Sequence, residues 1–248
     1  MSDVEPLLAD DWPRARRTID LVTAGTDDYR PELLELLTAQ ERARLDRLLR
    51  PPDRVRSSLG MVLLRLVASE RDGIDPRQIE IDRTCPECGT PHGKPRVAGG
   101  HHYSVGHAGD LVVVAATASG AVGVDVEPAD RRLVPTSIPD PDHRQLRSWV
   151  RREAVVKAIG DGRAVESDDP IVDDTAQGPL LIKASGIDPA TITIIDLDLD
   201  PAYVAALAFA SGEEPRVVHR AARPLLARWA TPVASAGDHR STHDGKTQ

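Results

Sequence analysis

Three carboxylates and a lysine occur at spacings that suit phosphate chemistry. Asp125 and Glu127 lie two residues apart at the end of the valine-rich run Gly123–Glu127, and Glu153 precedes Lys157 by four residues in a segment with helical periodicity. Alternate residues of a strand share one face, and residues four apart share one side of a helix. Three carboxylates can hold Mg²⁺ and leave positions for phosphate oxygens, which a lysine also neutralises. The pattern therefore predicts a magnesium site that handles phosphate.

Each cluster taken alone also has an ordinary explanation. Asp125 and Glu127 suit a strand edge that faces solvent, and Glu153 with Lys157 is a common helix pair worth about 0.2–0.5 kcal/mol. The two clusters together are far more specific than either one. Because we expect Asp125 to face solvent, we also expect that its replacement by alanine leaves the fold intact.

The elements that position these residues follow from apolar periodicity and from capping residues. We expect helices over 31–49 with a Thr38–Glu41 capping box, over 53–73 with Asp53 as N-cap and Gly73 as stop, over 144–159 with Gly160 as stop, and over 224–230. Pro51-Pro52 should end the first helix. Strands are predicted at 79–81, 102–105, 111–117, 121–127, 179–184, 191–199, 203–210 and 215–219. Ser119-Gly120 indicates a β-hairpin between two of them, and 83–100, 106–110 and 128–142 should be loops.

Composition excludes several classes of protein. The chain has 248 residues and a net charge of −8, with three tryptophans, three tyrosines and one phenylalanine. Negative charge repels nucleic acid, and so few rings make a poor base-stacking platform. The acidic N-terminus is no signal peptide, and no apolar stretch approaches the length needed to span a bilayer. We therefore expect a cytoplasmic protein that binds neither nucleic acid nor membrane.

Arginine is nonetheless concentrated in residues 41–71. Eight arginines stand there against four acids: Arg42, Arg44, Arg47, Arg50, Arg54, Arg56, Arg65 and Arg71. A solvated helix face explains such a run, and so does a local anion site on an otherwise acidic protein. The sequence leaves both explanations open.

Cys85, Cys88 and His92 are three possible zinc ligands. A structural zinc site uses four, and no second pair at finger-like spacing is evident in the sequence. A loop with two reduced thiols is the alternative, since two cysteines form no disulfide framework. The neighbouring His101 and His102 fit a surface pair.

Five segments, in this order, resemble the 4′-phosphopantetheinyl transferases of the surfactin-synthetase-activating (Sfp) type. The segments are RSSLG at 56–60, HGKP at 92–95, YSVGHAGD at 103–110, GVDVE at 123–127 and WVRREAVVKAIGDG at 149–162. The resemblance covers residues 38–215. It implies an α+β fold with a pseudo-twofold arrangement of two similar α/β halves, and coenzyme A in the cleft between them. We accordingly predict an N-terminal half at 1–117, a C-terminal half at 118–230 and a disordered tail at 231–248.

The resemblance also implies residue roles. Asp125, Glu127 and Glu153 would bind Mg²⁺, with Glu153 and Lys157 as the catalytic residues. Coenzyme A would contact Arg44, Arg56, Lys94, Pro95, Gly106, His107 and Lys157. Gly106 stands where the family usually has serine, so we expect Gly106→Ser to be tolerated.

The activity implied is transfer of 4′-phosphopantetheine from coenzyme A to a serine of an apo acyl or peptidyl carrier protein, with release of 3′,5′-ADP. The carriers would serve fatty acid, polyketide or nonribosomal peptide biosynthesis, and we expect the protein to be a monomer. Gly106 and a short connection from Glu127 to Trp149 leave a non-catalytic coenzyme A-binding or regulatory relative as an alternative. A small zinc-stabilised interaction module is the remaining one.

Overall fold

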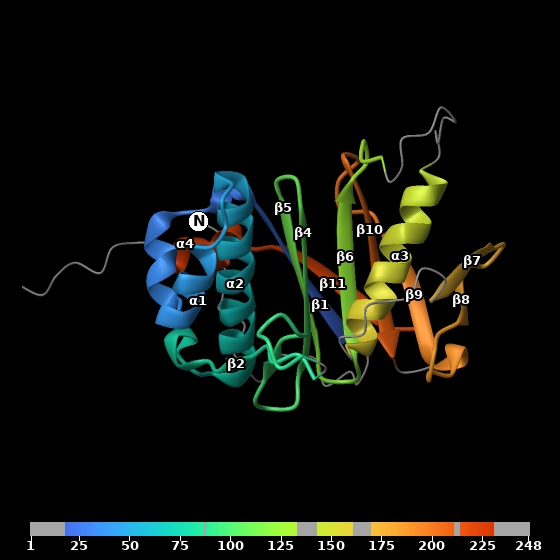
Figure 1. Ribbon diagram of the computed structural model, residues 1–248, viewed down its shortest axis with the longest axis horizontal. Helices are drawn as coiled ribbons and strands as arrows, with labels where there is room; N and C mark the ends of the chain where they lie inside the picture. Colours follow the sequence, from blue (N-terminus) through green and yellow to red (C-terminus); the bar gives the residue numbers. More distant parts are fainter. Residues whose placement is uncertain (1–17, 87, 133–142, 161–169, 211–213, 231–248) are drawn as a thin grey trace, which may run out of the picture.

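The computed structural model describes residues 18–86, 88–132, 143–160, 170–210 and 214–230. Figure 1 shows helices α1 (Ala39–Leu45), α2 (Pro51–Asp72) and α4 (Arg223–Trp229) at the left, then two sheets, then helix α3 (Arg144–Ile159) at the right. Short 3₁₀ turns lie at Thr26–Asp28, Pro31–Leu36, Pro76–Gln78 and Pro189–Thr191. The result is a mixed α and β fold in layers, as predicted.

The larger sheet has six strands in the order β11-β1-β5-β4-β3-β2, with bounds Arg216–Ala221, Thr18–Gly25, Leu111–Thr117, His102–Ala108, Arg96–Val97 and Ile81–Asp82. Only the β1–β11 pairing is parallel among these ladders. The smaller sheet has the order β6-β10-β9, with bounds Val122–Pro128, Tyr203–Ala210 and Ile192–Leu197. A separate hairpin pairs β7 (Ile171–Thr175) with β8 (Gly178–Lys183).

The layers enclose three cores, and one strand shows how. In β5, Val112 and Val114 face the cluster under α2, whereas Val113 and Ala115 face the cluster between the two sheets. Alternate side chains of a strand point to opposite faces, so a strand buried on both faces is apolar throughout. The third core lies between α3 and the outer face of the smaller sheet.

The predicted end points of the helices are partly confirmed. Thr38 Oγ1 accepts a hydrogen bond from the Glu41 N–H (3.2 Å), and Glu41 Oε2 accepts one from the Thr38 N–H (2.8 Å), so the capping box is present. Gly73 and Gly160 end α2 and α3 in the left-handed conformation. Pro51, however, begins a helix, because proline lacks the N–H that a first turn leaves unpaired anyway.

The hairpin predicted across Ser119-Gly120 is wrong. Strand β5 pairs with β1 and β4, whereas β6 pairs with β10 in the other sheet. The hairpin lies one strand earlier, where Ala108 pairs with Leu111 across the turn Gly109-Asp110. Strand β4 is therefore longer than predicted and includes Gly106 and His107, which we had placed in a loop.

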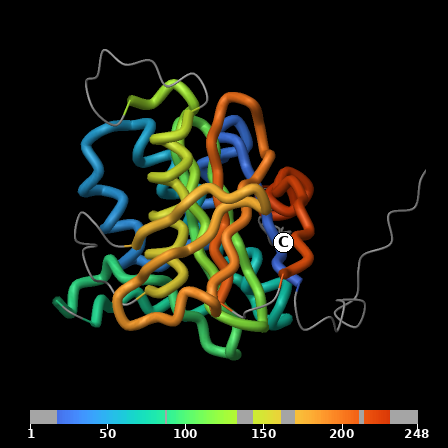
Figure 2. The backbone as a smooth tube through the Cα atoms, turned by 90° about the vertical axis from the view of Figure 1, so that its right-hand side faces the viewer, coloured from blue at the N-terminus to red at the C-terminus, as the bar shows by residue number. Residues whose placement is uncertain are grey.

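Arg151 ties α3 to the strands beside it. Its guanidinium donates to both carboxylate oxygens of Asp196 on β9 (2.8 and 2.6 Å) and to Asp174 on β7 (2.5 Å). Figure 2 shows the β7–β8 hairpin lying across α3 on the side that faces the viewer. Strand β7 has no counterpart among the predicted strands.

The remaining predictions concern how the two proposed halves are divided and how they are related. The pseudo-twofold relation, the cleft for coenzyme A and the division at residue 117 stay predictions. Residues 216–229, placed in the C-terminal half, form β11 and α4, which join the larger sheet and its core. The predicted tail 231–248 and most of the 128–142 loop lie outside the described residues. Within the described ranges, every helix is too short or too polar to cross a bilayer.

Candidate active site

Strand β6 and helix α3 approach each other unusually closely, and Gly123 is the reason. A Cβ atom at position 123 would lie 2.0 Å from the Ala154 carbonyl oxygen and 2.4 Å from the Ala158 nitrogen. Only a residue without a side chain fits between strand and helix here. The contact brings the acidic end of β6 under the side chains of Glu153 and Lys157, which the sequence could not show.

Asp125 lies at the centre of this contact. Lys157 Nζ is 2.6 Å from Asp125 Oδ1 and also donates to the carbonyl oxygen of Val124 (3.2 Å). The Asp125 side chain is only 9% exposed, so the expectation that it faces solvent was wrong. Its second oxygen, Oδ2, is buried without a hydrogen-bond partner. An unpartnered carboxylate oxygen is costly in a protein interior and is placed to take a ligand.

Glu153 stands on α3 beside this pair. Burial raises the pKa of Glu153 above its usual value, and the negative charge of Asp125 raises it further, while Lys157, Arg152 and Arg131 oppose the shift. A half-buried carboxyl beside a second carboxylate is the situation that a bound cation relieves. The raised pKa also makes Glu153 a better proton acceptor than an ordinary glutamate at neutral pH.

Glu127, the third predicted metal ligand, is held by a different cation. Its carboxylate pairs with Arg131, whose guanidinium lies over the Trp149 ring at 5.8 Å from the centroid. Single oxygens chosen from Asp125, Glu127 and Glu153 do not all come within 4.8 Å of one another. The three acids share one end of the β6–α3 contact, and side-chain rotation must bring them together before they can share an ion.

The basic residues form a second group next to the acids. Partial burial of the ring lowers the pKa of His107 on β4. The positive charge of Lys157 lowers it further, and Arg56 and Arg83 act in the same direction. The His107 side chain itself is exposed to solvent. His107, Lys157, Arg56 and Arg83 thus repel further positive charge and attract an anion.

Several predicted coenzyme A ligands make protein contacts of their own. Arg56 pairs with Asp53 and donates to the Gly109 carbonyl (2.9 Å). Lys94 Nζ donates to the carbonyl oxygens of Val122 and Ala158, both at 2.8 Å, and burial lowers the pKa of Lys94 to about 8, with Arg96 contributing. Lys94 therefore holds the segment containing the neighbouring Pro95 against the start of β6 and the end of α3.

Gly106 packs against the acidic strand. A Cβ atom there would lie 3.0 Å from the Val124 carbonyl oxygen and 3.4 Å from the Asp125 Cα. Strands β4 and β6 are further joined by the Val124 N–H, which donates to Ser104 Oγ (3.0 Å). Gly106 contributes close backbone packing, and a serine there must push the two strands apart.

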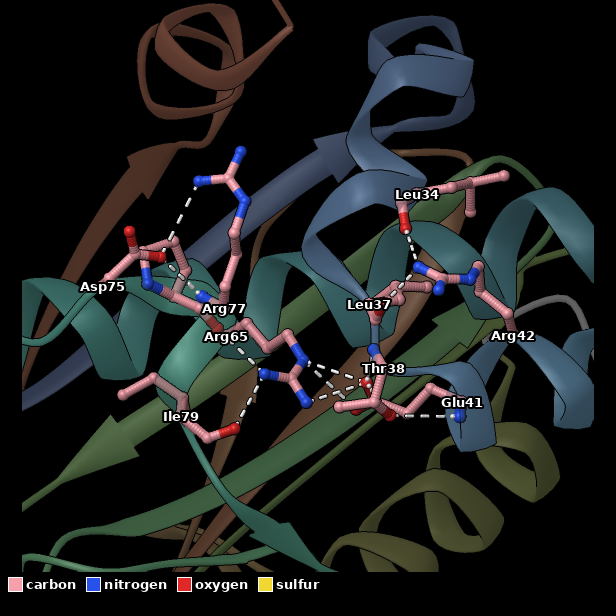
Figure 3. A network of polar contacts seen from close by, with 10 residues as sticks. Leu34, Leu37, Thr38, Glu41, Arg42, Arg65, Asp75, Arg77 and Ile79 are labelled. Atoms are coloured by element: carbon pink, nitrogen blue, oxygen red, sulfur yellow. Dashed lines mark hydrogen bonds and ion pairs between the residues drawn. The ribbon is translucent and has the colours of Figure 1, made fainter.

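A pocket of about 880 Å³ opens beside α1 and the 76–92 segment. Its walls carry five arginines and three acids: Arg44, Arg47, Arg65, Arg77, Arg83, Glu41, Glu80 and Asp82. Buried Arg65 connects the segments that form this pocket (Figure 3). Its guanidinium pairs with Glu41 (2.8 Å) and donates to the carbonyls of Pro76 (2.8 Å) and Ile79 (2.7 Å). None of the predicted metal ligands lines this pocket, whereas the predicted coenzyme A ligand Arg44 does.

Arg83 is a candidate that sequence reasoning missed. Burial lowers the pKa of Arg83 to about 10, and the positive charge of Arg44 lowers it further against the opposing effect of Glu41. Two charged guanidinium groups held near each other form a site for an anion. No sequence signal marked Arg83, which lies in a segment predicted as loop. The arginines of the run 41–71 therefore have different roles: Arg54 and Arg56 pair with acids, Arg44 and Arg47 line the pocket, and Arg65 does both.

One protein family and several curated proteins have sequences similar to this chain. Residues 26–119 match the model of the family described as 4′-phosphopantetheinyl transferase, N-terminal. The phosphopantetheinyl transferase of Thraustochytrium sp. is 36% identical over 103 residues, which cover 42% of this chain and 35% of that protein. The 4′-phosphopantetheinyl transferase HetI of Nostoc sp. is 27% identical over 76% of this chain and 85% of its own length. A 4′-phosphopantetheinyl transferase of Bacillus subtilis is 25% identical over 71% of this chain and 83% of its own length.

The structure thus combines a layered fold, a group of acids at the β6–α3 contact and a separate pocket lined by arginines. The sequence matches indicate the class of protein: the chain is similar to the 4′-phosphopantetheinyl transferases.

Proposed function

We propose that this chain is a Mg²⁺-dependent 4′-phosphopantetheinyl transferase of the Sfp type. It transfers phosphopantetheine from coenzyme A to a serine hydroxyl of an apo acyl or peptidyl carrier protein and releases 3′,5′-ADP. The proposal rests on the sequence similarity to 4′-phosphopantetheinyl transferases and on one structural observation, the buried and unpartnered Asp125 Oδ2 between Lys157 and Glu153.

The acids suit Mg²⁺ by their chemistry. Magnesium takes oxygen ligands, and Asp125 offers a buried oxygen with no other partner. Burial and the charge of Asp125 raise the pKa of Glu153. A bound divalent cation would stabilise the ionised carboxylate and so oppose this shift. Asp125, Glu127 and Glu153 would hold the ion, which when bound supplies Lewis-acid neutralisation of the pyrophosphate oxygens.

The residues of the chain account for the other needs of the reaction. The serine Oγ forms a bond to the β-phosphorus of coenzyme A, the pyrophosphate P–O bond breaks, and 3′,5′-ADP leaves with the bonding electrons. Glu153 takes the serine proton, directly or through water. Lys157, fixed by Asp125 and two strand carbonyls, neutralises the phosphate oxygens. Such catalysis is mainly positioning and charge neutralisation.

Coenzyme A binding falls to the basic group. We assign its phosphates to Arg44, Arg56, His107 and Lys157, and add Arg83 to this set because it lies near both Arg44 and His107. Gly106 and Pro95 would lie along the bound coenzyme. Lys94 acts as a positioning residue through its two carbonyl contacts.

The direct test measures the mass of an apo carrier protein after incubation with coenzyme A, Mg²⁺ and the purified chain. We expect a mass increase equal to one phosphopantetheine, and its loss when EDTA removes the metal. Asp125→Asn keeps the size of the side chain and should reduce turnover by at least about 100-fold. The control Asp198→Asn alters an exposed acid and should leave turnover unchanged.

Two outcomes would contradict the proposal. Full activity in EDTA would remove the metal from the mechanism. Tight coenzyme A binding without transfer to any apo carrier of the fatty acid, polyketide or nonribosomal peptide classes would favour the non-catalytic relative.

A further inference from the structure

A second group of side chains, outside the site above, has the composition of a metal centre. Cys85 Sγ, Cys88 Sγ and a ring nitrogen of His92 lie within 4.8 Å of one another. Cys88 Sγ is 2.9 Å from His92 Nε2. Among the described residues, no other group of three or more His, Cys, Asp or Glu side chains has its ligand atoms this close together. Both cysteines are free thiols in the structure.

The backbone holds these ligands in place before any ion binds. The Gly89 N–H donates to the Cys85 carbonyl (2.9 Å) while Gly89 adopts φ +69°, so the chain turns sharply just after Cys88. Only glycine takes this conformation at little cost. The Cys85 N–H donates to the Thr90 carbonyl (2.8 Å), which folds the loop back and returns His92 toward the cysteines.

The ends of the loop are also joined. The Gly93 N–H donates to the Arg83 carbonyl (2.7 Å), and a Cβ at Gly93 would lie 3.0 Å from the carbonyl oxygens of Arg83 and Thr84. Backbone hydrogen bonds therefore close the loop both near the cysteines and at its two ends. A site whose ligands are positioned in advance loses less conformational entropy when it binds.

We propose that Cys85, Cys88 and His92 bind a zinc-class cation, with a solvent molecule as the fourth ligand. Thiolate and imidazole are the ligands that Zn²⁺ prefers, and three protein ligands with one open position is an established arrangement. Zinc–ligand bonds of about 2.0–2.3 Å in a tetrahedron place ligand atoms about 3.5 Å apart. The Cys88–His92 contact therefore has to open by only about half an ångström, and the thiol protons are released to solvent as the ion binds.

The position of the loop places the ion beside the arginine pocket. Thr90, Pro91 and His92 line the arginine pocket, and Arg44 Nη1 donates to the Pro91 carbonyl (2.6 Å). An ion at this loop would hold one wall of the pocket and the start of the segment that carries Lys94. The inference stands on the loop alone and does not require the transferase activity.

The experiment uses the full chain without an affinity tag, reduced, stripped of metal by a chelator and titrated with Co²⁺. Tetrahedral cobalt with thiolate ligands gives intense charge-transfer and visible d–d absorption, which the magnesium ligands of the acidic site cannot produce. We expect saturation at about one ion per chain and loss of the absorption when Zn²⁺ is added. Protein purified without added metal should contain zinc by elemental analysis.

Variants separate the site from general metal binding. Cys88→Ser is the main one, because Cys88 is exposed and its loss leaves the core intact, whereas Cys85 is buried. Cys88→Ser and His92→Ala should lose the cobalt absorption and the rise in melting temperature that zinc gives the parent chain. The control His219→Ala changes an exposed histidine on β11 and should behave like the parent.

Three results would overturn the proposal: no thiolate–cobalt absorption in the reduced chain, equal absorption in Cys88→Ser, or a Cys85–Cys88 disulfide in freshly purified protein. Normal carrier modification with no zinc would reject this site and leave the proposed function standing. Zinc binding without transfer would do the reverse.

Discussion

The acidic site and the arginine pocket handle charge in opposite ways. At the β6–α3 contact each strand acid has a cation beside it, Asp125 with Lys157 and Glu127 with Arg131. In the pocket region the nearby charges of Arg44 and Arg83 are alike, and Glu41 opposes them only in part. Each strand acid thus has a counter-charge within the protein, although Asp125 Oδ2 stays without a partner, whereas the pocket gains most from an anion brought by a ligand.

The two regions also differ in construction. The acidic site is made by one strand and one helix in backbone contact, so its geometry depends on packing. The pocket is made by helix ends and a loop joined by side chains such as Arg65. Packing substitutions should therefore destroy the first, and charge substitutions should weaken the second without unfolding it.

The largest effect is expected from Gly123→Val. The valine side chain would collide with the Ala154 carbonyl and the Ala158 nitrogen, both backbone atoms that cannot move independently of α3. We expect a loss of at least about 3 kcal/mol in the free energy of unfolding, measured by chemical denaturation. Gly25→Ala is the matched control, since the nearest atom to its Cβ is 3.9 Å away. A stable Gly123→Val chain would mean that strand and helix do not touch in this way.

Glu153→Gln should lower turnover by about 10²–10⁴-fold, the usual contribution of a general base. The same variant should be more stable than the parent at neutral pH. The folded pKa of Glu153 is raised, so the parent loses stability as pH rises from the ordinary glutamate value through the folded value. Melting temperatures at pH 4 and pH 7.5 test this, with the gain expected at the higher pH. A variant less stable than the parent at pH 7.5 would contradict the view that ionised Glu153 destabilises the folded chain.

Arg83→Ala should raise the Michaelis constant for coenzyme A roughly 10- to 100-fold while leaving kcat and stability nearly unchanged. The reason is the loss of one hydrogen bond from a charged donor, worth about 1.5–3 kcal/mol. Kinetics with coenzyme A and with dephospho-coenzyme A measure the effect, which should be smaller for the second donor if Arg83 binds the 3′-phosphate. Arg216→Ala, an exposed arginine on β11, is the control. Equal effects on both donors would place Arg83 elsewhere on the coenzyme.

The smallest effect is expected from Gly106→Ser, a substitution that the sequence predicts to be tolerated and for which the structure shows a tight contact. The new Cβ would meet the Val124 carbonyl at 3.0 Å, so β4 and β6 must separate slightly and carry Asp125 with them. A cost of about 1–3 kcal/mol in stability is expected, with reduced kcat/KM. Thermal melts and steady-state kinetics check it, and unchanged values in both would restore the original expectation.

The sequence by itself determined several local elements and singled out the residues of the acidic site. The Thr38–Glu41 capping box and the stops at Gly73 and Gly160 depend on neighbouring residues only, and they are present as predicted. The acids and Lys157 were found because strand and helix periodicity place their side chains on shared faces. Short-range patterns of this kind depend on backbone geometry, which is the same wherever the element lies.

Only the tertiary structure decided which elements meet. It placed β5 and β6 in different sheets, although a turn signal joins them in sequence. It buried Asp125 and brought Arg83 from a loop to the basic group. It also showed that Gly123 and Gly106 allow backbones to approach. Each of these depends on contacts between residues far apart in the chain, and such contacts follow from how whole layers pack, a property that no local window of residues contains.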